Sequence, residues 1–402
     1  MVGSNYLSTG FLTLMAGIVV LQSQSCLEEK TPATTVADAD VVADLISDVG
    51  PLVVIPTIEA FISEMETLQQ KVAELETKAT NSEDVTQSRT DAQDQWIIAM
   101  SVWQQLEVMQ VGPAGSSLSF IAGQDIRDEI YSWPTVNPCR IDQKTVGDEW
   151  KNDDYFEANL VNAYGLDALE HLLFAGPESI CPSQVAPVND GSWDALGENG
   201  VNINRAQFSG KIIDNVITQA NSLKNLWAES GGNFSALLDA EAADSPYEDR
   251  QQSLNELYRA LFYLETRTKD RKLAQPLGLR DCSEDLCIED VELITSGTAI
   301  EAVISNLHGF QTLFTGGEGI GFDDLLVELG HADLSTQILA DIEETISLAE
   351  EIDQPLGLAI ENDYETVMAM YESLSRITTA LKLDLAAVLN MEIPQEAAGD
   401  ND

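Results

Sequence analysis

Apolar residues recur at helical spacing through most of this chain, and this periodicity limits the possible folds more than any other feature. Between residues 51 and 78, eight apolar positions fall mostly three or four residues apart, on one face of a helix: Val53, Ile58, Phe61, Ile62, Met65, Leu68, Val72 and Leu75. Similar patterns cover 88–111, 117–131, 153–174, 205–229, 249–272, 288–314, 333–351 and 357–390. Alternating patterns typical of β-strands are scarce. The chain is therefore predicted to be all-α, with helices long enough to form bundles.

Breaks in this periodicity divide the expected helices into two groups. One break falls at 132–150, and the longest falls at 175–204, which is rich in Pro, Gly and Asn. A loop of that length is usually functional or structurally constrained. We therefore expect two helical-bundle halves joined by a long irregular loop, with an N-terminal bundle over 41–200 and a C-terminal bundle over 201–402.

The charge of the chain excludes several classes of partner. Its 68 Asp and Glu residues against 20 Lys and Arg residues give a net charge of −48, while a hydrophobic content of 44% is normal for a folded protein. With so few cations, the chain is not expected to bind nucleic acid or anionic lipid surfaces. The acidity either keeps the protein soluble or concentrates cations at its surface. Arg127 and Arg140 are expected to be buried partners of carboxylates.

The N-terminal residues predict export. Residues 11–22 form an apolar run that is too short to span a bilayer but has the length of a signal-peptide core. Cys26 follows small and polar residues, as at a lipoprotein cleavage site. We expect a signal peptide over 1–25, lipidation of Cys26 and an acidic tether over 26–40. The protein would then reside in the periplasm or at the outer membrane and would contact the membrane only through its lipid anchor.

The remaining four cysteines are consistent with export. Four cysteines allow three pairings. Cys282 and Cys287 enclose only the residues SEDL, so we expect them to close a local disulfide, which leaves Cys139 and Cys181 as the second pair. Such bridges persist in oxidising compartments. The alternative is that all four remain free thiols.

The strongest candidate for chemistry lies at 158–174, which is predicted to form one helix. Asp167, Glu170 and His171 stand at positions i, i+3 and i+4, so they project from one face. Two carboxylates and an imidazole can hold a divalent or trivalent metal such as iron, zinc or manganese. The alternative is a solvated polar face in which His171 is a partner of the carboxylates. Gly165 would allow another backbone to approach closely.

The segment YGLDALEHLLF around this cluster resembles the signature of the imelysin family, also called insulin-cleaving metalloproteases, whose hallmark is a GxHxxE motif. Over about residues 40–402, further segments resemble the family in the same order: MQVGP, IYSWPTVNPCRIDQ, KLAQPLGL, LRDCSEDLC and NLHGFQTLFTG. The resemblance implies an all-helical, exported protein of two bundle-like halves, often lipid-anchored and associated with bacterial iron uptake.

The motif departs from the family pattern at one position. The family Gly and Glu fall on Gly165 and Glu170, whereas the family His is Asp167 here. An Asp ligand adds negative charge and makes a bound metal a weaker Lewis acid, which disfavours catalysis but not oxygen-rich binding of iron. We expect a protein that takes part in iron uptake. At this motif it would bind either a metal, with iron favoured over zinc, or an iron-uptake envelope protein. The alternatives are a metallopeptidase, with Glu170 as general base and His171 as a ligand, and a non-catalytic module that docks another envelope protein.

Overall fold

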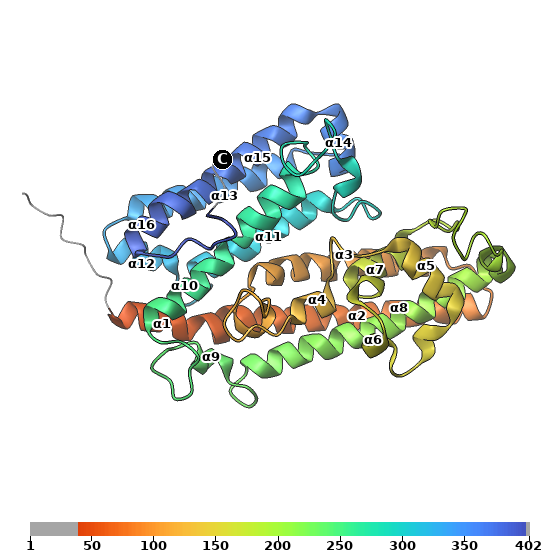
Figure 1. Ribbon diagram of the computed structural model, residues 1–402, viewed down its shortest axis with the longest axis horizontal. Helices are drawn as coiled ribbons and strands as arrows, with labels where there is room; N and C mark the ends of the chain where they lie inside the picture. The colour runs from red at the N-terminus through yellow and green to blue at the C-terminus, as the bar shows by residue number, and fades with distance from the viewer. Residues whose placement is uncertain (1–38, 399–402) are drawn as a thin grey trace, which may run out of the picture. The chain divides into compact units, whose positions relative to one another are not determined.

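The computed structural model describes residues 39–398, which contain helices and no β-strand, so the predicted all-α class is confirmed (Figure 1). The expected signal peptide, Cys26 and nearly all of the expected tether lie outside the described residues. The first helices are α1 (Ala39–Asp48), α2 (Ile55–Thr80), α3 (Thr86–Val108), α4 (Ile126–Ile130), α5 (Pro138–Gly147), α6 (Tyr155–Ala158), α7 (Leu166–Phe174) and α8 (Ser192–Trp227). They are followed by α9 (Phe234–Leu237), α10 (Arg250–Leu261), α11 (Ala299–Thr315), α12 (Phe322–Glu328), α13 (Ala332–Glu350), α14 (Leu356–Asn362), α15 (Tyr364–Ala380) and α16 (Ala386–Leu389).

Shorter or wider helical turns connect several of these helices. The π-helices are η1 (Val49–Val54), η5 (Leu264–Ala274) and η7 (Leu381–Leu385), and the 3-10 turns are η2 (Gly112–Ala114), η3 (Glu149–Lys151), η4 (Val161–Ala163) and η6 (Ile288–Asp290). Because the backbone stays helical at Asp48 and Val54, α1, η1 and α2 form one continuous run. Part of this run has a mean hydropathy of 1.8, enough by length and composition to cross a membrane, although a buried core helix meets the same criterion.

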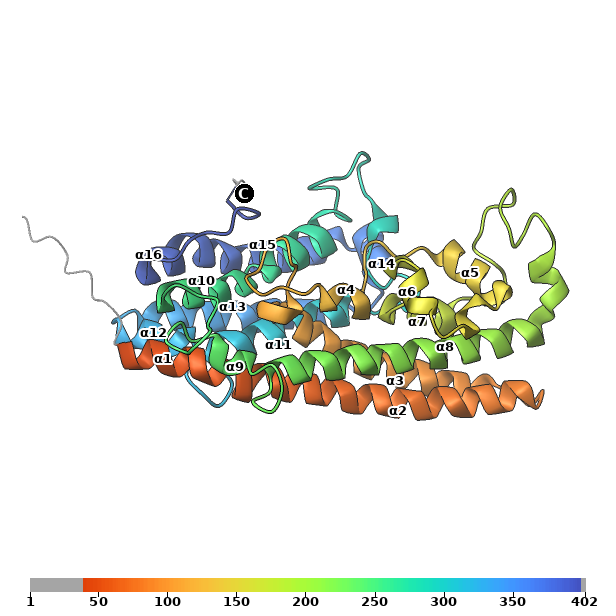
Figure 2. The ribbon, with the colours of Figure 1, turned by 60° about the horizontal axis from the view of Figure 1, so that its bottom comes forward.

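The first group of helices is built around α2, which packs along both α3 and α8 (Figure 2). The apolar stripe predicted over 51–78 is buried there, and Ile58, Phe61 and Met65 are fully buried. Helices α5 and α7 pack against α8. The helical period of the sequence therefore predicts which face of α2 forms the core.

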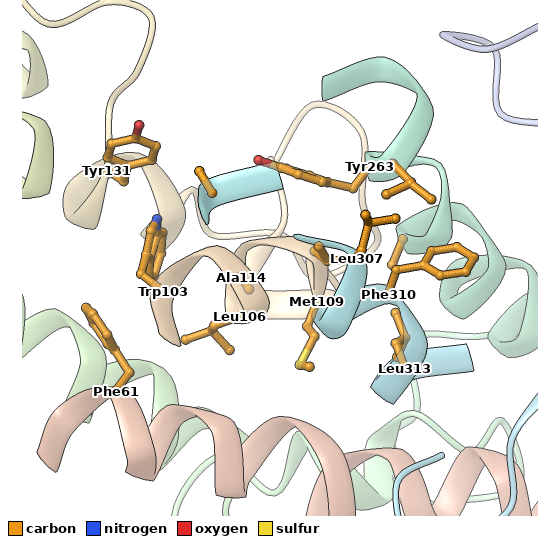
Figure 3. Close-up of a cluster of buried hydrophobic side chains, with 14 of the residues drawn as sticks. Phe61, Trp103, Leu106, Met109, Ala114, Tyr131, Tyr263, Leu307, Phe310 and Leu313 are labelled. Carbon is orange, nitrogen blue, oxygen red and sulfur yellow. The ribbon is translucent and has the colours of Figure 1, made fainter. Parts of the chain in front are cut away.

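The second group consists of α11, α13 and α15, in which α13 packs against both neighbours and η5 packs against α11 and α15. Helix α11 also packs against α3 and so joins the two groups. Figure 3 shows this junction as one cluster of buried side chains, with Phe61 from α2, Trp103 from α3, and Leu307 and Phe310 from α11. The apolar core is thus continuous between the groups.

Several helix boundaries differ from the expectation, and glycine or proline lies at some of them. The single helix expected over 158–174 is wrong, because Gly165 has a φ of 101° and α7 begins only at Leu166. Of the helix expected over 117–131, only α4 is helical. The expected break at 132–150 contains α5, which begins at a proline and is capped by Asn137, whose side chain accepts a hydrogen bond from the backbone N–H of Arg140.

The irregular segment is shorter than expected. It covers 175–191, and α8 begins at Ser192 and passes through Gly197, whose φ of 67° is not helical. The division expected between residues 200 and 201 falls inside α8, which packs along α2. In the C-terminal part, the expected helix over 288–314 begins at α11, and the one over 357–390 is divided among α14, α15, η7 and α16.

Both expected disulfides are present. Cys139–Cys181 connects α5 to the irregular 175–191 segment, and Cys282–Cys287 closes the loop that follows η5. The first bridge joins residues 42 positions apart, so it restrains the irregular segment next to α5. This restraint matters for the site described below, because residues of that segment contact α5.

Candidate functional site

The start of α7 is placed by a close contact between two backbones. A Cβ atom on Gly165 would lie 2.9 Å from the carbonyl oxygen of Ile130, closer than a side chain tolerates. The φ of 101° and ψ of −175° at Gly165 also belong to a region that essentially only glycine adopts. The end of α4 and the start of α7 therefore meet only because this position has no side chain.

Asp167 is the first of the predicted site residues on α7, and it is 3% exposed. Its Oδ2 accepts a hydrogen bond from the Ser132 hydroxyl at 2.8 Å, and its Oδ1 accepts one from the Ala168 N–H at 3.0 Å. Burial has the largest effect on its pKa and raises it from 3.8 to about 7, although these bonds and the charge of Arg127 act in the opposite direction. The carboxyl group therefore gains and loses its proton near neutral pH.

Glu170 lies one turn further along α7 and is 8% exposed. Its Oε1 accepts hydrogen bonds from the backbone N–H and the hydroxyl of Ser296, at 2.8 and 2.9 Å. Burial raises the pKa of Glu170 from 4.5 to about 7; the Ser296 bonds lower it, and the negative charge of Glu292 adds to the rise. Because Ser296 lies three residues before the first residue of α11, Ala299, Glu170 connects α7 to the segment that leads into the second group of helices.

His171 is directed at α5. Its Nε2 lies 2.8 Å from Oδ1 of Asp142, whose Oδ2 accepts hydrogen bonds from the Ser179 hydroxyl and the Ile180 N–H, both at 2.8 Å. Burial alone would raise the pKa of Asp142, but the hydrogen bond and charge of His171, together with the bonds from Ile180 and Ser179, lower it overall. Ser179 and Ile180 belong to the segment that the Cys139–Cys181 disulfide attaches to α5.

A cavity of about 360 Å³ brings the three predicted residues together, and we call it the carboxylate cavity. Asp167, Glu170 and His171 all line it. Glu289 and Asp290 contribute two further carboxylates, while Arg271 and Gln275 come from η5 and the residue after it. The remaining wall is largely apolar and consists of Trp133, Pro134, Val136, Pro138, Val291, Leu293, Ile294 and Thr295.

The predicted metal ligands share this cavity without forming a ready-made chelate. Within residues 39–398, no three His, Cys, Asp or Glu side chains are grouped so that they could hold a metal ion. Asp167 and Glu170 are each hydrogen-bonded to a serine, and His171 is bonded to Asp142. From α7 the cavity is lined by the two carboxyl groups and by the His171 imidazole, whose Nε2 is engaged with Asp142.

Sequence reasoning missed a buried ionic network beside this cavity. The ammonium group of Lys272 donates to Oε1 of Gln104 at 2.6 Å and to Oδ1 of Asn306 at 2.9 Å, and it lies 3.0 Å from Oε2 of Glu292. The Tyr131 hydroxyl donates to Oε1 of Glu292 at 2.7 Å. Since these residues come from α3, η5, α11 and the segments before α5 and α11, the network spans both groups of helices.

The two arginines singled out in the sequence have different environments. Arg127 donates to the buried carboxylate of Glu107, so its prediction as a partner of a buried carboxylate is confirmed. Arg140 is exposed and donates to Oε1 of Gln143 at 3.2 Å, so the same prediction is wrong for Arg140. Arg140 lies on the outer face of α5, where no carboxylate approaches within ion-pair distance among the described residues.

Comparisons with known proteins identify a family and a shared fold. The model of the imelysin family (Peptidase M75) matches residues 55–381. The crystal structure of an imelysin-like protein from Psychrobacter arcticum 273-4 is similar, with a TM-score of 0.62, 16% identity, and coverage of 89% of this chain and 98% of that chain. The structure of a protein proposed to be an iron-regulated protein A precursor, from Parabacteroides distasonis ATCC 8503, gives a TM-score of 0.66, 14% identity, and coverage of 89% and 97%. At these identities the likeness shows a shared fold. No curated protein matches the chain.

Proposed function

This chain belongs to the imelysin family, and from that premise we propose that it is an exported, iron-related protein whose carboxylate cavity binds a metal cation. The observation that carries the proposal is that Asp167 and Glu170, both buried, line the same cavity. The likeness to a protein proposed to be an iron-regulated protein A precursor supports iron as the metal. Two disulfides favour an oxidising compartment and so support export.

The chemistry of the donors fits a hard cation. Glu289 and Asp290 bring the number of carboxylates around the cavity to four, against the single cation Arg271. Oxygen ligands suit iron and manganese, whereas zinc is usually bound with nitrogen or sulfur ligands, and His171 is the one imidazole in the cavity lining, which contains no cysteine. We propose that Asp167 and Glu170 hold the cation directly and that iron binds more tightly than zinc. The net charge of −48 also raises the local concentration of cations.

Titration calorimetry of the full chain with iron, zinc and manganese salts tests this proposal. We expect Asp167→Asn combined with Glu170→Gln to weaken iron binding by at least about tenfold, because two charged ligands are lost while their shape is retained. A control variant with Asp91→Asn and Asp94→Asn removes two carboxylates with the same spacing from α3 and should bind as the parent does. If the Asp167/Glu170 variant binds every metal as tightly as the parent, the assignment of the cavity is wrong.

A metallopeptidase is the second candidate, because Glu170 faces a cavity in which a substrate could meet it. This activity requires that Glu170 take a proton from a water molecule. Cleavage of an unfolded protein that is sensitive to chelators and lost in Glu170→Gln would favour it. Metal binding without any cleavage would leave the metal-binding proposal in place.

The third candidate is a non-catalytic docking module. It would be favoured if an envelope protein co-purifies with the chain whether or not metal is present and whether or not Asp167 is replaced.

A further inference from the structure

A second cavity collects positive charge in a protein that has very little of it. The cavity measures about 380 Å³, within the usual range of small-molecule sites, and we call it the arginine cavity. It is lined by four of the chain's 20 Lys and Arg residues: Arg259, Arg267, Arg271 and Arg280. Such a concentration is unexpected at a net charge of −48 unless these side chains have a partner of opposite charge.

Two of the four arginines are already neutralised by carboxylates that line the same cavity. Arg259 pairs with Glu396, because its Nη2 donates to both carboxylate oxygens, at 2.7 and 2.9 Å. Arg280 lies 2.9 Å from Asp270 and 3.8 Å from Asp281. These contacts account for all three carboxylates in the lining.

The other two arginines, Arg267 and Arg271, have no such partner. They lie four residues apart on η5 and both line the arginine cavity. Neither donates a hydrogen bond to, or forms an ion pair with, another residue in the described part of the chain. The Nε atom of Arg271 is buried and has no hydrogen-bond partner. A buried N–H of a charged group without an acceptor is unfavourable, so the site is incomplete without a ligand that accepts hydrogen bonds.

We propose that the arginine cavity binds a small multivalent oxyanion, of the class that includes polycarboxylates and phosphate esters. Guanidinium groups pair with carboxylate and phosphate oxygens through two parallel N–H···O bonds, which favours such an anion over a neutral ligand. Arg267 and Arg271 are the primary contacts. The Arg259–Glu396 and Arg280–Asp270 pairs form part of the cavity wall, and Gln275 adds an uncharged amide to the lining. This inference concerns a second cavity, which shares Arg271 and Gln275 with the carboxylate cavity, and it does not depend on metal binding there.

Equilibrium titration of the full chain with citrate, and separately with inorganic phosphate, at fixed ionic strength and without metal, tests the proposal. We expect the parent to bind at least one probe, and Arg267→Gln combined with Arg271→Gln to weaken that binding by at least about tenfold. A control with Arg140→Gln and Lys211→Gln removes two positive charges from α5 and α8 and should bind within about twofold of the parent. Preference for citrate or for phosphate distinguishes the two kinds of anion.

A second variant separates a binding role from a structural one. Arg267→Lys with Arg271→Lys keeps both charges and removes the planar fork, so we expect weaker binding at an unchanged unfolding midpoint. The proposal is overturned if the parent binds neither probe, or if the Gln variant and its control bind equally well.

Discussion

Burial sets the protonation of the carboxyl groups at the centre of the site. Asp167 has a pKa of 3.8 in an unfolded chain and about 7 in the folded protein, mainly because burial disfavours its charged form. Between these two values the folded protein holds a proton that the unfolded chain has released. This contribution to stability is therefore present below about pH 4 and is lost as the pH rises towards 7.

This sign predicts the pH dependence of an isosteric variant. The Asn side chain of Asp167→Asn resembles a protonated Asp and does not titrate. As the pH rises from about 4 to 7, the parent should therefore lose stability relative to the variant, by up to about 1.4 kcal/mol per pH unit. Denaturant unfolding at a series of pH values measures this difference. Asp94→Asn, an exposed change on α3, controls for the loss of one negative charge and should give a flat difference. If the difference in free energy of unfolding between Asp167→Asn and the parent does not change with pH, the raised pKa assigned to Asp167 is wrong.

At this scale the sequence predicted three side chains that share one cavity, but not their hydrogen-bond partners. The spacing of Asp167, Glu170 and His171 within one helix is visible in the sequence, and all three line one cavity. Ser132, Ser296 and Asp142 come from segments 35, 126 and 29 residues away, and helical periodicity carries no information about such contacts. The sequence did indicate a concentration of positive charge on and around η5. Six of the chain's 20 cations fall between residues 259 and 280: Arg259, Arg267, Lys269, Arg271, Lys272 and Arg280.

Among the elements, α7 depends most on a single backbone conformation. We expect Gly165→Ala to lower the free energy of unfolding by about 1–3 kcal/mol, because φ at Gly165 is 101° and a Cβ would meet the Ile130 carbonyl oxygen. Gly176→Ala, just after the same helix, is the matched control, since a Cβ there meets nothing within 4 Å. Denaturant unfolding of both variants measures the effect, and equal stability would show that α7 can begin differently.

The same position explains why long helices were predicted better than short ones. Apolar periodicity averages over many residues, so it found α2 and α3, whose buried faces are long. It ran through Gly165 because one residue with positive φ does not disturb the average. The start of α5 carried a recognisable signal in Asn137 and Pro138, an N-cap followed by a proline, which the nearby Pro134 obscured.

At the scale of the whole molecule, buried charged contacts connect the two groups of helices in addition to apolar packing. Lys272 is 1% exposed and bonded to residues of α3 and α11. Its removal leaves the buried carboxylate of Glu292 without its cation. We therefore expect Lys272→Met to lower the free energy of unfolding by about 3–5 kcal/mol.

The matched control is Lys211→Met, a change at a half-buried position of α8 that should alter stability by no more than about 0.5 kcal/mol. Unfolding of both variants in denaturant at one pH gives the comparison. A Lys272→Met protein as stable as the parent would mean that apolar packing alone joins the groups. The all-α class followed from periodicity, whereas this charged junction did not, because charged residues in a helix ordinarily predict a solvated face.

Arg271 and Gln275 line both the carboxylate cavity and the arginine cavity. Two ligands separated by a shared side chain are thermodynamically linked. An anion that draws the Arg271 guanidinium towards itself reduces the repulsion that this group exerts on a cation beside Asp167 and Glu170. Binding of anion and cation should then be positively cooperative, and the factor by which each strengthens the other must be the same in both directions.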